Sequence, residues 1–464
     1  MKNKDFFYLQ LEKIFIENRM YMQPWFENAP SKEELIDRTK KELEDHMEGV
    51  YSISDDYIQK LLSIKNSYIA HYDGSKLEYE IVKDKIQYIL RENKIDFKSI
   101  KYDIGPTVTL YKVMLGAESR MKKVQLLEAD IQLELGAIGV RVIVPLPSRT
   151  NVFGIEVSNK NPQPVTMQSI WDSSVWKSEK KMVLPVALGR SINGEVFMFD
   201  LNKTKNLLIV GACGTGKSVA IDAIINSLIQ KVDPNKLKFV LIDPKCIEFT
   251  PYKKISRMYI AAMRGHEDED PIITTCHQTI DILNSLMVEY QQREDLLMAY
   301  GCRNIDAYNE KVSGTDKVKP HIIVVIDEFA DFILQAGKKF ERPLCRLSQM
   351  GAFCGIHFVI STGRPSRNII TGVIAANFWT RMAFRTAGII DSITILTSRG
   401  AESLIGRGDM LFSGKGELMR VQCGYISKEE VENLTNEVET LLSDDDDIEP
   451  YTLPFCKVKD IKNV

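Results

Sequence analysis

The residues best suited to chemistry lie in the glycine-rich stretch 211–218, which reads GACGTGKS. It matches the pattern G-x-x-x-x-G-K-[ST], in which glycines let successive backbone N–H groups surround a phosphate chain. The apolar run 206–210 precedes the stretch and the helix-forming run 217–231 follows it, so a phosphate would meet the positive end of a helix. We therefore predict a nucleotide-binding loop formed by Gly211, Ala212, Cys213, Gly214, Thr215, Gly216, Lys217, Ser218 and Val219.

Side chains in and beyond this loop suggest hydrolysis. Lys217 is expected to contact the β- and γ-phosphates of ATP, and the Ser218 hydroxyl is expected to bind Mg²⁺. Asp327 and Glu328 follow the apolar run 321–326. There Asp327 could hold the magnesium shell through water, and Glu328 could polarise the attacking water. The sequence thus predicts a P-loop ATPase that uses ATP and Mg²⁺, with Lys217, Asp327 and Glu328 as catalytic residues.

The elements that must position these groups are short apolar strands separated by helical segments. Runs 206–211, 238–243, 321–328 and 355–362 are apolar through most of their length. Continuous apolar strands between helices are typical of a parallel sheet covered on both faces. Their order predicts an α/β fold with a RecA-like P-loop ATPase core, in which the strand after the carboxylate strand lies beside the phosphate-loop strand. The tip of that strand, residues 361–363, would then face the γ-phosphate.

Cores of this kind usually act as rings, whose sites are completed by an arginine from the neighbouring subunit. Three arginines that follow the predicted strand 355–362 are candidates for that role: Arg364, Arg381 and Arg385.

The pattern of apolar and charged residues divides the chain into four predicted parts. Residues 1–79 carry apolar side chains three and four positions apart between charges, which indicates a helical region. Residues 80–175 combine an amphipathic helical run with strand-like runs, which indicates a small mixed α/β domain. Residues 176–430 are predicted to form the RecA-like domain, and residues 431–464 a C-terminal helix with an acidic tail.

Composition limits the class of protein. Of 464 residues, 44% are hydrophobic and 27% are charged, as expected of a folded protein with more than one domain. The net charge of −3 excludes a surface that is basic all over, although not local basic loops. The eight cysteines form no CxxC pair, which favours reduced thiols over a zinc site. No apolar run is long enough to cross a bilayer, so we expect a cytoplasmic location, with any recruitment to the membrane made through a partner.

Longer motifs resemble the motor region of the FtsK/SpoIIIE family of DNA translocases. The resemblance covers about residues 80–430 and includes LIDPK (241–245), VVIDEFADFI (324–333) and GAESLIGRGDML (400–411). The earlier segment GVRVIVPLPSRTNVFGIEV (139–157) resembles the same family. The resemblance implies a homo-oligomer, a hexameric ring, that moves double-stranded DNA through its centre.

The resemblance also implies roles for particular residues. Arg381 matches the position of the arginine that acts on the neighbouring subunit's site. The segment around Lys338 and Lys339 matches a loop that faces the pore, where these cations would contact phosphates without reading bases. Arg367 is a further DNA-contact candidate. The alternative reading of the three DNA-contact cations is solvated surface charge.

The sequence departs from the family pattern at three positions. Gly363 stands where the family usually has a glutamine, whose amide can bind the γ-phosphate or the attacking water. Ile389 and Ile393 stand where the family has Lys and Arg. The family's membrane helices and winged-helix module have no counterpart, so we expect neither anchoring at a septum nor orientation by DNA sequence without a partner. These departures bear on the hydrolysis rate and on coupling between subunits.

The leading hypothesis is an ATP-dependent double-stranded DNA translocase that acts as a ring. Two alternatives stay open. One is a coupling ATPase of a conjugation or secretion system, which moves protein or nucleoprotein. The other is a DNA-binding ring with weak or lost hydrolysis. A membrane-anchored or mobile-element partner would bind through residues 1–79.

Overall fold

The structure, a computed structural model, describes most of the chain from residue 77 onward. Most of the predicted helical region 1–79 and the acidic stretch 444–447 lie outside the described residues. The described residues are 36–37, 39–41, 43, 58, 77–116, 121–144, 146, 151–265, 269–414, 416–441 and 450–455.

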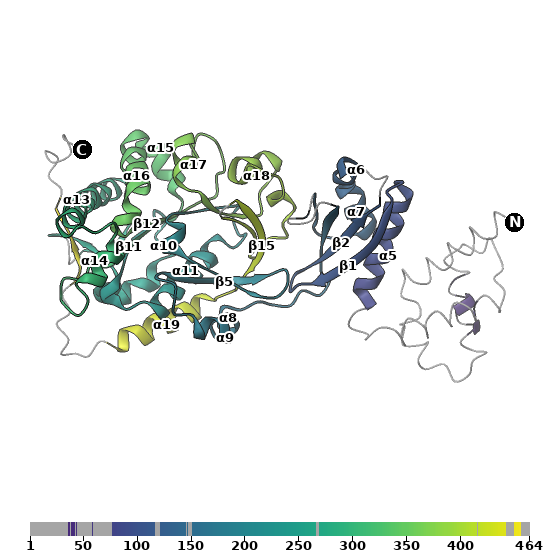
Figure 1. Cartoon of the computed structure of the whole chain (residues 1–464), viewed down its shortest axis with the longest axis horizontal. Coiled ribbons are helices and arrows are strands. Elements are labelled where there is room, and N and C mark those ends of the chain that lie inside the picture. Colours follow the sequence, from purple (N-terminus) through teal and green to yellow (C-terminus); the bar gives the residue numbers. More distant parts are fainter. Residues whose placement is uncertain are drawn as a thin grey trace. The chain divides into compact units, whose positions relative to one another are not determined.

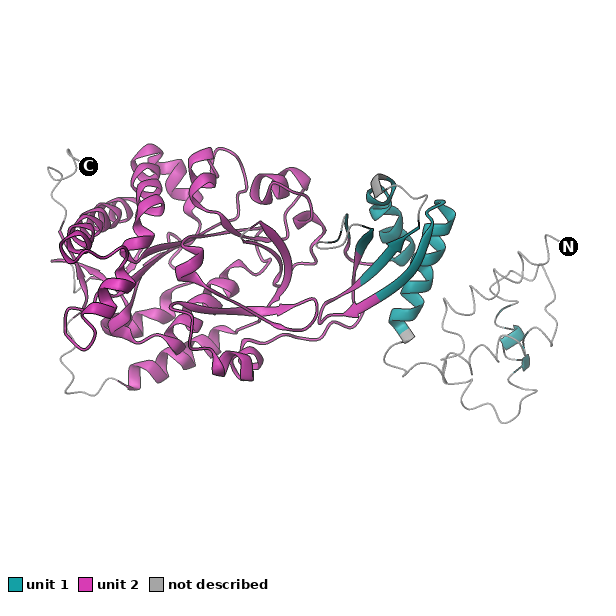
Figure 2. Cartoon of the chain, in the orientation of Figure 1, with its two compact units in different colours: residues 1–101, 111–136, 142–154 teal, residues 102–110, 137–141, 155–464 magenta. Residues whose placement is uncertain are grey.

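The chain packs as two compact units (Figure 2). One unit comprises residues 1–101, 111–136 and 142–154, and the other comprises residues 102–110, 137–141 and 155–464. The domain limits at residues 79, 175 and 430 remain predictions.

The first part of the described chain forms a four-stranded sheet with the order β1-β2-β4-β3. Helix α5 (Leu77–Glu92) buries Ile86, Ile89 and Leu90, whose spacing of three and four residues places them on one face. The strands are β1 (Phe97–Ile104), β2 (Val108–Leu115), β3 (Val140–Ile143) and β4 (Val152–Ser158), with α6 (Met121–Gln125) and α7 (Glu128–Leu135) between β2 and β3 in the chain.

The second part is built on a large sheet with the order β10-β8-β11-β12-β7-β13-β14-β15-β5-β6. The strands from β10 to β13 in this order are parallel, and β14, β15, β5 and β6 continue the sheet in antiparallel fashion. A short pair, β9 with β16, lies apart from it. The strands are β5 (Pro185–Ser191), β6 (Val196–Asp200), β7 (Leu207–Val210), β8 (Leu237–Ile242), β9 (Ala262–Met263), β10 (Ile272–Ile273), β11 (His321–Ile326), β12 (Ile356–Thr362), β13 (Thr380–Phe384), β14 (Asp409–Gly414), β15 (Glu417–Cys423) and β16 (Thr452–Leu453).

Helices cover both faces of the large sheet (Figure 1). Alternate residues of β7 show why its run is apolar throughout: Leu207 and Ile209 join one hydrophobic cluster, whereas Leu208 and Val210 join the other. The first cluster is covered by α8 (Met167–Trp171), α9 (Ser174–Ser178), α10 (Leu201–Thr204), α11 (Lys217–Lys231), α12 (Ser256–Tyr259) and α19 (Lys428–Thr440). The second is covered by α13 (Cys276–Tyr300), α14 (Ile305–Lys311), α15 (Phe329–Ala336), α16 (Lys338–Met350), α17 (Gly372–Asn377) and α18 (Ile389–Leu396).

The predicted core topology is confirmed, because β12 lies between β11 and β7. Val359 of β12 pairs in parallel with Val325 on one side and with Leu207 on the other. The carboxyl ends of parallel strands meet at one edge of a sheet. The loop after β7, the carboxylates after β11 and the tip of β12 therefore come together. Among the described helices, none combines the length and apolar character that crossing a bilayer requires.

Candidate nucleotide site

The phosphate loop leaves β7 and turns directly into α11, as predicted. Gly214 has φ = 72° and Gly216 has φ = 118°, values that residues with a side chain rarely adopt. A Cβ added at Gly216 would lie 2.9 Å from the Cα of Gly408, so the loop packs backbone to backbone against the segment that contains Gly408. The Gly408 N–H donates to the Thr215 carbonyl (2.9 Å), which joins the two segments. This backbone suits a ligand that N–H groups bind, such as a phosphate chain.

Lys217 is the cation of this loop. Its Nζ donates to the carbonyl oxygens of Gly211 (2.9 Å) and Ala212 (3.0 Å). Burial lowers the pKa of Lys217, while the carboxylates of Glu328 and Asp327 act in the opposite direction. A phosphate would offer this ammonium charged acceptors, which form stronger hydrogen bonds than carbonyls do.

The two carboxylates after β11 are buried and held by the tip of β12. Asp327 accepts a hydrogen bond from the Ser361 hydroxyl, and burial raises its pKa. Glu328 accepts hydrogen bonds from the Thr362 hydroxyl (2.8 Å) and the Gly363 N–H (3.1 Å). Its own backbone has φ = 46° and ψ = 51°, a left-handed conformation that is uncommon for glutamate. Such strain persists where neighbouring contacts fix it, and it is concentrated at functional sites.

A third part of the site, the loop 244–249 after β8, lies outside the residues predicted from the sequence. Asp243 is fully buried, and its carboxylate accepts hydrogen bonds from the backbone N–H groups of Lys245 (2.9 Å), Ile247 (2.8 Å) and Glu248 (2.8 Å). These bonds fix the course of the loop at the edge where the phosphate loop begins. An Asp-Pro pair at the end of an apolar strand is a turn signal and could have drawn attention to this loop.

Two side chains of this loop reach different parts of the site. The Nζ of Lys245 lies 3.6 Å from Oε2 of Glu328. The Ser218 hydroxyl donates to Oε1 of Glu248 (3.1 Å), and Nζ of Lys428 in α19 lies 4.0 Å from the other oxygen of that carboxylate. The loop therefore connects the residue predicted to polarise water with the residue predicted to bind the metal.

The oxygen donors fit the metal that the motifs imply. Ser218, Asp327 and Glu248 offer hydroxyl and carboxylate oxygens, the ligands that Mg²⁺ prefers. Mg²⁺ is usually bound by one or two protein groups together with substrate phosphates, rather than by a protein cage. Among the residues that the structure describes, no group of three or more His, Cys, Asp and Glu side chains could hold a metal ion by itself. The donor set suits a magnesium ion that arrives with a nucleotide.

The guanidinium of Arg381, in β13, is engaged within its own chain. It donates to the carbonyl oxygens of Phe378 (2.9 Å), Ile395 (2.6 Å) and Ala375 (2.6 Å). These bonds join α17 to the end of α18, and burial lowers the pKa of Arg381. The role of Arg381 in a neighbouring subunit's site stays a prediction.

The other two arginine candidates are exposed. Nη2 of Arg364 lies 3.7 Å from Oδ1 of Asp331. Arg385 directly follows β13, and its carbonyl accepts a hydrogen bond from the Ala212 N–H of the phosphate loop (2.9 Å). The structure therefore brings Arg385 next to the nucleotide loop of its own chain.

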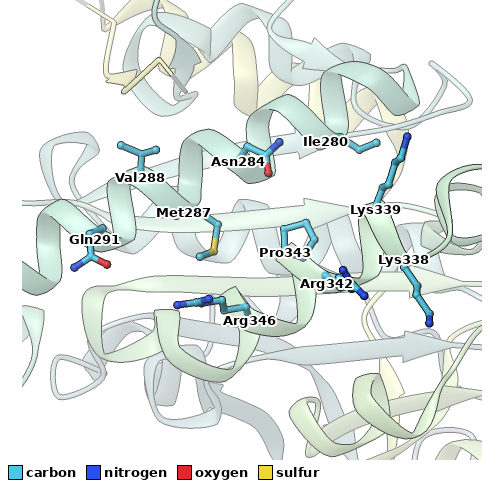
Figure 3. Close-up of a pocket in the computed structure, with 10 residues that line it drawn as sticks. All are labelled: Ile280, Asn284, Met287, Val288, Gln291, Lys338, Lys339, Arg342, Pro343 and Arg346. Atoms are coloured by element: carbon cyan, nitrogen blue, oxygen red, sulfur yellow. The ribbon is translucent and has the colours of Figure 1, made fainter. Parts of the chain in front are cut away.

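The predicted DNA contacts lie on separate segments. Lys338 and Lys339 begin α16 and line a pocket between α13 and α16 (Figure 3). Arg367 is exposed in the segment after β12 and does not line that pocket. All three stay predicted contacts.

The positions that depart from the family pattern have different surroundings. A Cβ at Gly363 would lie 3.4 Å from Oε2 of Glu328 and 3.8 Å from Nζ of Lys217, so a longer side chain there would enter the centre of the site. Ile389 and Ile393 are 40% and 42% exposed on α18, which leaves apolar surface uncovered in the chain.

Comparison with known proteins gives matches along most of the described chain. Residues 167–367 match the FtsK/SpoIIIE family, and residues 60–159 match the FtsK alpha domain. The DNA translocase FtsK of Chlorobaculum tepidum is 41% identical over 357 residues, which cover 76% of this chain and 44% of that protein. The DNA translocase FtsK of Staphylococcus aureus strain MRSA252 is 33% identical over 422 residues, which cover 88% of this chain and 52% of that protein. The chain spans about half the length of the curated relatives it matches.

Two solved structures share the fold. The pCW3 conjugation coupling protein TcpA, in a monomer form with ATPγS, has a TM-score of 0.54 at 22% identity and covers 77% of this chain and 99% of its own. The cytoplasmic domain of the Thermomonospora curvata type VII secretion ATPase EccC has a TM-score of 0.51 at 19% identity and covers 59% of this chain and 34% of its own. At these identities the likeness establishes the P-loop ATPase fold alone.

Proposed function

The chain belongs to the FtsK/SpoIIIE family, and from this premise we propose that it is an ATP-driven motor that moves double-stranded DNA through a ring of identical subunits. The observation that carries the proposal is the arrangement at one sheet edge. There the tip of β12 holds the carboxylate of Glu328 beside the ammonium of Lys217 and the loop that binds phosphates.

Nucleotide binding is the first task of the site. The N–H groups at the start of α11 would bind the phosphate chain of ATP, and Lys217 would exchange its two carbonyl acceptors for phosphate oxygens. Ser218 would bind Mg²⁺, with Asp327 and Glu248 behind it, and the bound ion would neutralise developing charge on the phosphates.

Glu328 would activate the attacking water. The Thr362 hydroxyl and the Gly363 N–H fix one carboxylate oxygen, and the ammonium of Lys245 lies near the other. A carboxylate with its position fixed in this way can accept a proton from a water placed between it and the γ-phosphate. Because Gly363 has no side chain, the orientation of that water depends on Glu328 and on backbone groups.

The motor part of the proposal is supported by the family and by exposed cations. We assign Lys338, Lys339 and Arg367 as phosphate contacts, which suits a motor that must run over any DNA sequence. The ring is proposed to be a hexamer in the cytoplasm. A membrane-anchored or mobile-element partner would bind through residues 1–79.

The proposal is tested by steady-state ATP hydrolysis with and without long linear duplex DNA. DNA is expected to stimulate turnover of the unmodified chain. Lys217→Ala is expected to lose nucleotide binding, whereas Glu328→Ala should keep binding and lose about 10²-fold or more in turnover. ATP binding without any DNA-dependent turnover in the unmodified chain would contradict a motor that acts alone.

A DNA-binding ring with weak hydrolysis is the second candidate, and the missing side chain at Gly363 favours it. This candidate predicts normal ATP and DNA binding with negligible turnover. The same experiment also separates the motor from a coupling ATPase that moves protein, because only the motor is expected to respond to naked duplex DNA.

A further inference from the structure

The pocket lined by Lys338 and Lys339 is a groove between two helices. Its volume is about 690 Å³, and its two walls differ in character (Figure 3). The α13 wall is half-buried and uncharged, with Ile280, Met287 and Val288 providing apolar surface. We call this feature the α13–α16 groove.

The α16 wall is cationic. It contributes Lys338, Lys339, Arg342 and Arg346, all of them exposed, and no acidic residue lines the groove. Three of these cations follow one another at four-residue intervals, so they form a stripe along one face of α16. None of the four side chains forms an ion pair or hydrogen bond with another described residue. Four like charges along two turns of helix repel one another and favour an acidic partner.

The shape of the groove favours a peptide helix beside Arg342 and Arg346, whereas Lys338 and Lys339, at the start of α16, keep the phosphate contacts proposed above. Packed helices lie about 8–10 Å apart, which leaves room for side chains of a third helix but not for a DNA duplex. Single strands are usually bound by stacking on aromatic side chains, and no aromatic residue lines this groove. An amphipathic helix with acidic and apolar residues would match both walls.

The chain itself carries an acidic helix face in α19, whose apolar residues Val431, Leu434 and Val438 pack against the core of their own unit. Four exposed glutamates lie along it, and Leu441, directly after it, is 74% exposed. Among the described residues none of these glutamates has an ion-pair partner. The glutamates are Glu429, Glu432, Glu437 and Glu439.

α19 cannot fill the groove of its own chain, because the two features lie on opposite faces of the large sheet. Val431 of α19 belongs to one hydrophobic cluster, and Leu344 of α16 belongs to the other. Figure 1 shows α16 and α19 at opposite edges of the same unit. A contact between them therefore has to join two copies, and when it repeats head to tail it is the kind of contact that closes into rings.

We propose that α19 of one copy docks by its acidic face in the α13–α16 groove of a second copy. Arg342 and Arg346 would pair with glutamates of α19, and Leu441 would cover the apolar surface of α13. α19 also begins beside the nucleotide site, through Lys428 and Glu248, so this contact would place a neighbouring subunit next to bound nucleotide. The inference extends the proposed ring, but it requires neither hydrolysis nor DNA.

A charge swap tests the contact. Self-association of the full chain is measured by sedimentation velocity with ATPγS and without DNA. The groove variant Arg342→Glu/Arg346→Glu and the helix variant Glu432→Arg/Glu439→Arg are each expected to raise the dissociation constant about tenfold or more, because charges of like sign then face each other. Mixed in equal amounts, the two variants should assemble as the unmodified chain does, since every contact in an alternating assembly again pairs opposite charges.

The matched control is Lys236→Glu/Glu417→Arg, which reverses two exposed charges elsewhere and should leave assembly unchanged. Nucleotide affinity, measured with a fluorescent ATP analogue, shows that each variant is folded. Unchanged assembly in both swapped variants would overturn the proposal. So would assembly that stays normal while the groove variant loses DNA binding, because the groove would then be a phosphate contact. Failure of DNA-stimulated hydrolysis alone would count against the proposed function and leave this contact standing.

Discussion

Glu328 combines a strained backbone with a carboxylate that several groups hold in place. Its φ of 46° costs free energy, on the order of 1–3 kcal/mol, which the surrounding contacts must offset. Thr362 and Gly363 provide two of these contacts and Lys245 provides a third. At the scale of single residues, the site is therefore a carboxylate positioned in advance, and its neighbours are the residues to vary.

Replacement of Lys245 by alanine removes the cation beside Glu328. We expect kcat to fall about tenfold, which corresponds to about 1.4 kcal/mol of transition-state stabilisation. Nucleotide affinity should stay close to that of the unmodified chain, because the phosphate loop is untouched. Lys253→Ala, which removes another half-exposed lysine with a carboxylate partner, serves as the control. An unchanged kcat in Lys245→Ala would show that the ion pair plays no part in turnover.

Replacement of Glu248 by glutamine keeps the shape of the side chain and removes its charge. Because this carboxylate accepts the hydrogen bond of the predicted metal ligand Ser218, we expect the Mg²⁺ concentration needed for half-maximal nucleotide binding to rise about tenfold. The measurement is a magnesium titration with a fluorescent ATP analogue. Binding of the analogue without Mg²⁺ should not change. Identical magnesium titrations of the variant and the unmodified chain would show that Glu248 does not contribute to Mg²⁺ binding.

Asp222, in α11, makes stability depend on pH. Burial raises its pKa from the ordinary value of 3.8 to about 7, although the Tyr252 hydroxyl donates to it (2.7 Å) and acts in the opposite direction. At low pH the carboxyl is neutral in both the folded and the unfolded states. As the pH rises from about 4 to about 7, only the unfolded state ionises freely, so the free energy of unfolding falls.

The variant Asp222→Asn lacks this titration. Its free energy of unfolding should match that of the unmodified chain near pH 4 and exceed it above pH 7 by an amount on the order of 2 kcal/mol. Urea unfolding at a series of pH values measures the difference. If the difference in free energy of unfolding between the two proteins does not vary with pH, burial does not raise the pKa of Asp222.

At the scale of elements, Arg381 joins one internal strand of the sheet to two helices. The guanidinium links β13 to α17 and α18 through three carbonyl oxygens. Arg381→Ala leaves these carbonyls without their charged donor, so we expect a loss of stability of about 2–4 kcal/mol. Thermal unfolding measures it, and Arg385→Ala, at an exposed position in the same segment, is the control. Loss of hydrolysis in Arg381→Ala without any change in thermal stability would instead support the predicted role in a neighbouring subunit.

Elements whose residues are buried on both faces could be predicted from the sequence. The apolar runs that form β7, β8, β11 and β12 are each buried along their whole length, so composition alone identifies them. The strand β1 could not be found in this way, because only Ile100 is buried among exposed and half-buried residues. Its place depends on pairing with β2, a partner that only the folded chain brings to it.

The candidate site follows the same division. The local sequence pattern indicates the chemistry of four site residues: Lys217, Ser218, Asp327 and Glu328. Glu248 lies in no such motif, because its place in the site depends on backbone hydrogen bonds to the buried Asp243. The engagement of Arg381 within its own chain also depends on α17 and α18 folding against β13.

At the scale of the whole molecule, the described part of the nucleotide site lies within one compact unit. The phosphate loop, the carboxylates, the tip of β12 and the loop 244–249 all belong to residues 155–464. We therefore expect one copy to bind a nucleotide by itself and the contribution of other copies to appear in turnover.

Mixtures of active and inactive copies distinguish a coupled ring from independent subunits. Glu328→Gln keeps the fold and the nucleotide loop, so it should enter assemblies as readily as the unmodified chain. If subunits hydrolyse ATP independently, the DNA-stimulated rate falls in proportion to the inactive fraction. If six subunits must act together, the fully active rings in an equal mixture make up about 2% of the total, and the rate falls far below proportion. We expect the steeper curve. The double variant Glu328→Gln/Arg346→Glu provides the decisive comparison. A copy that is inactive and also impaired in assembly should enter few rings, so it should lower the rate only in proportion to its fraction of the mixture.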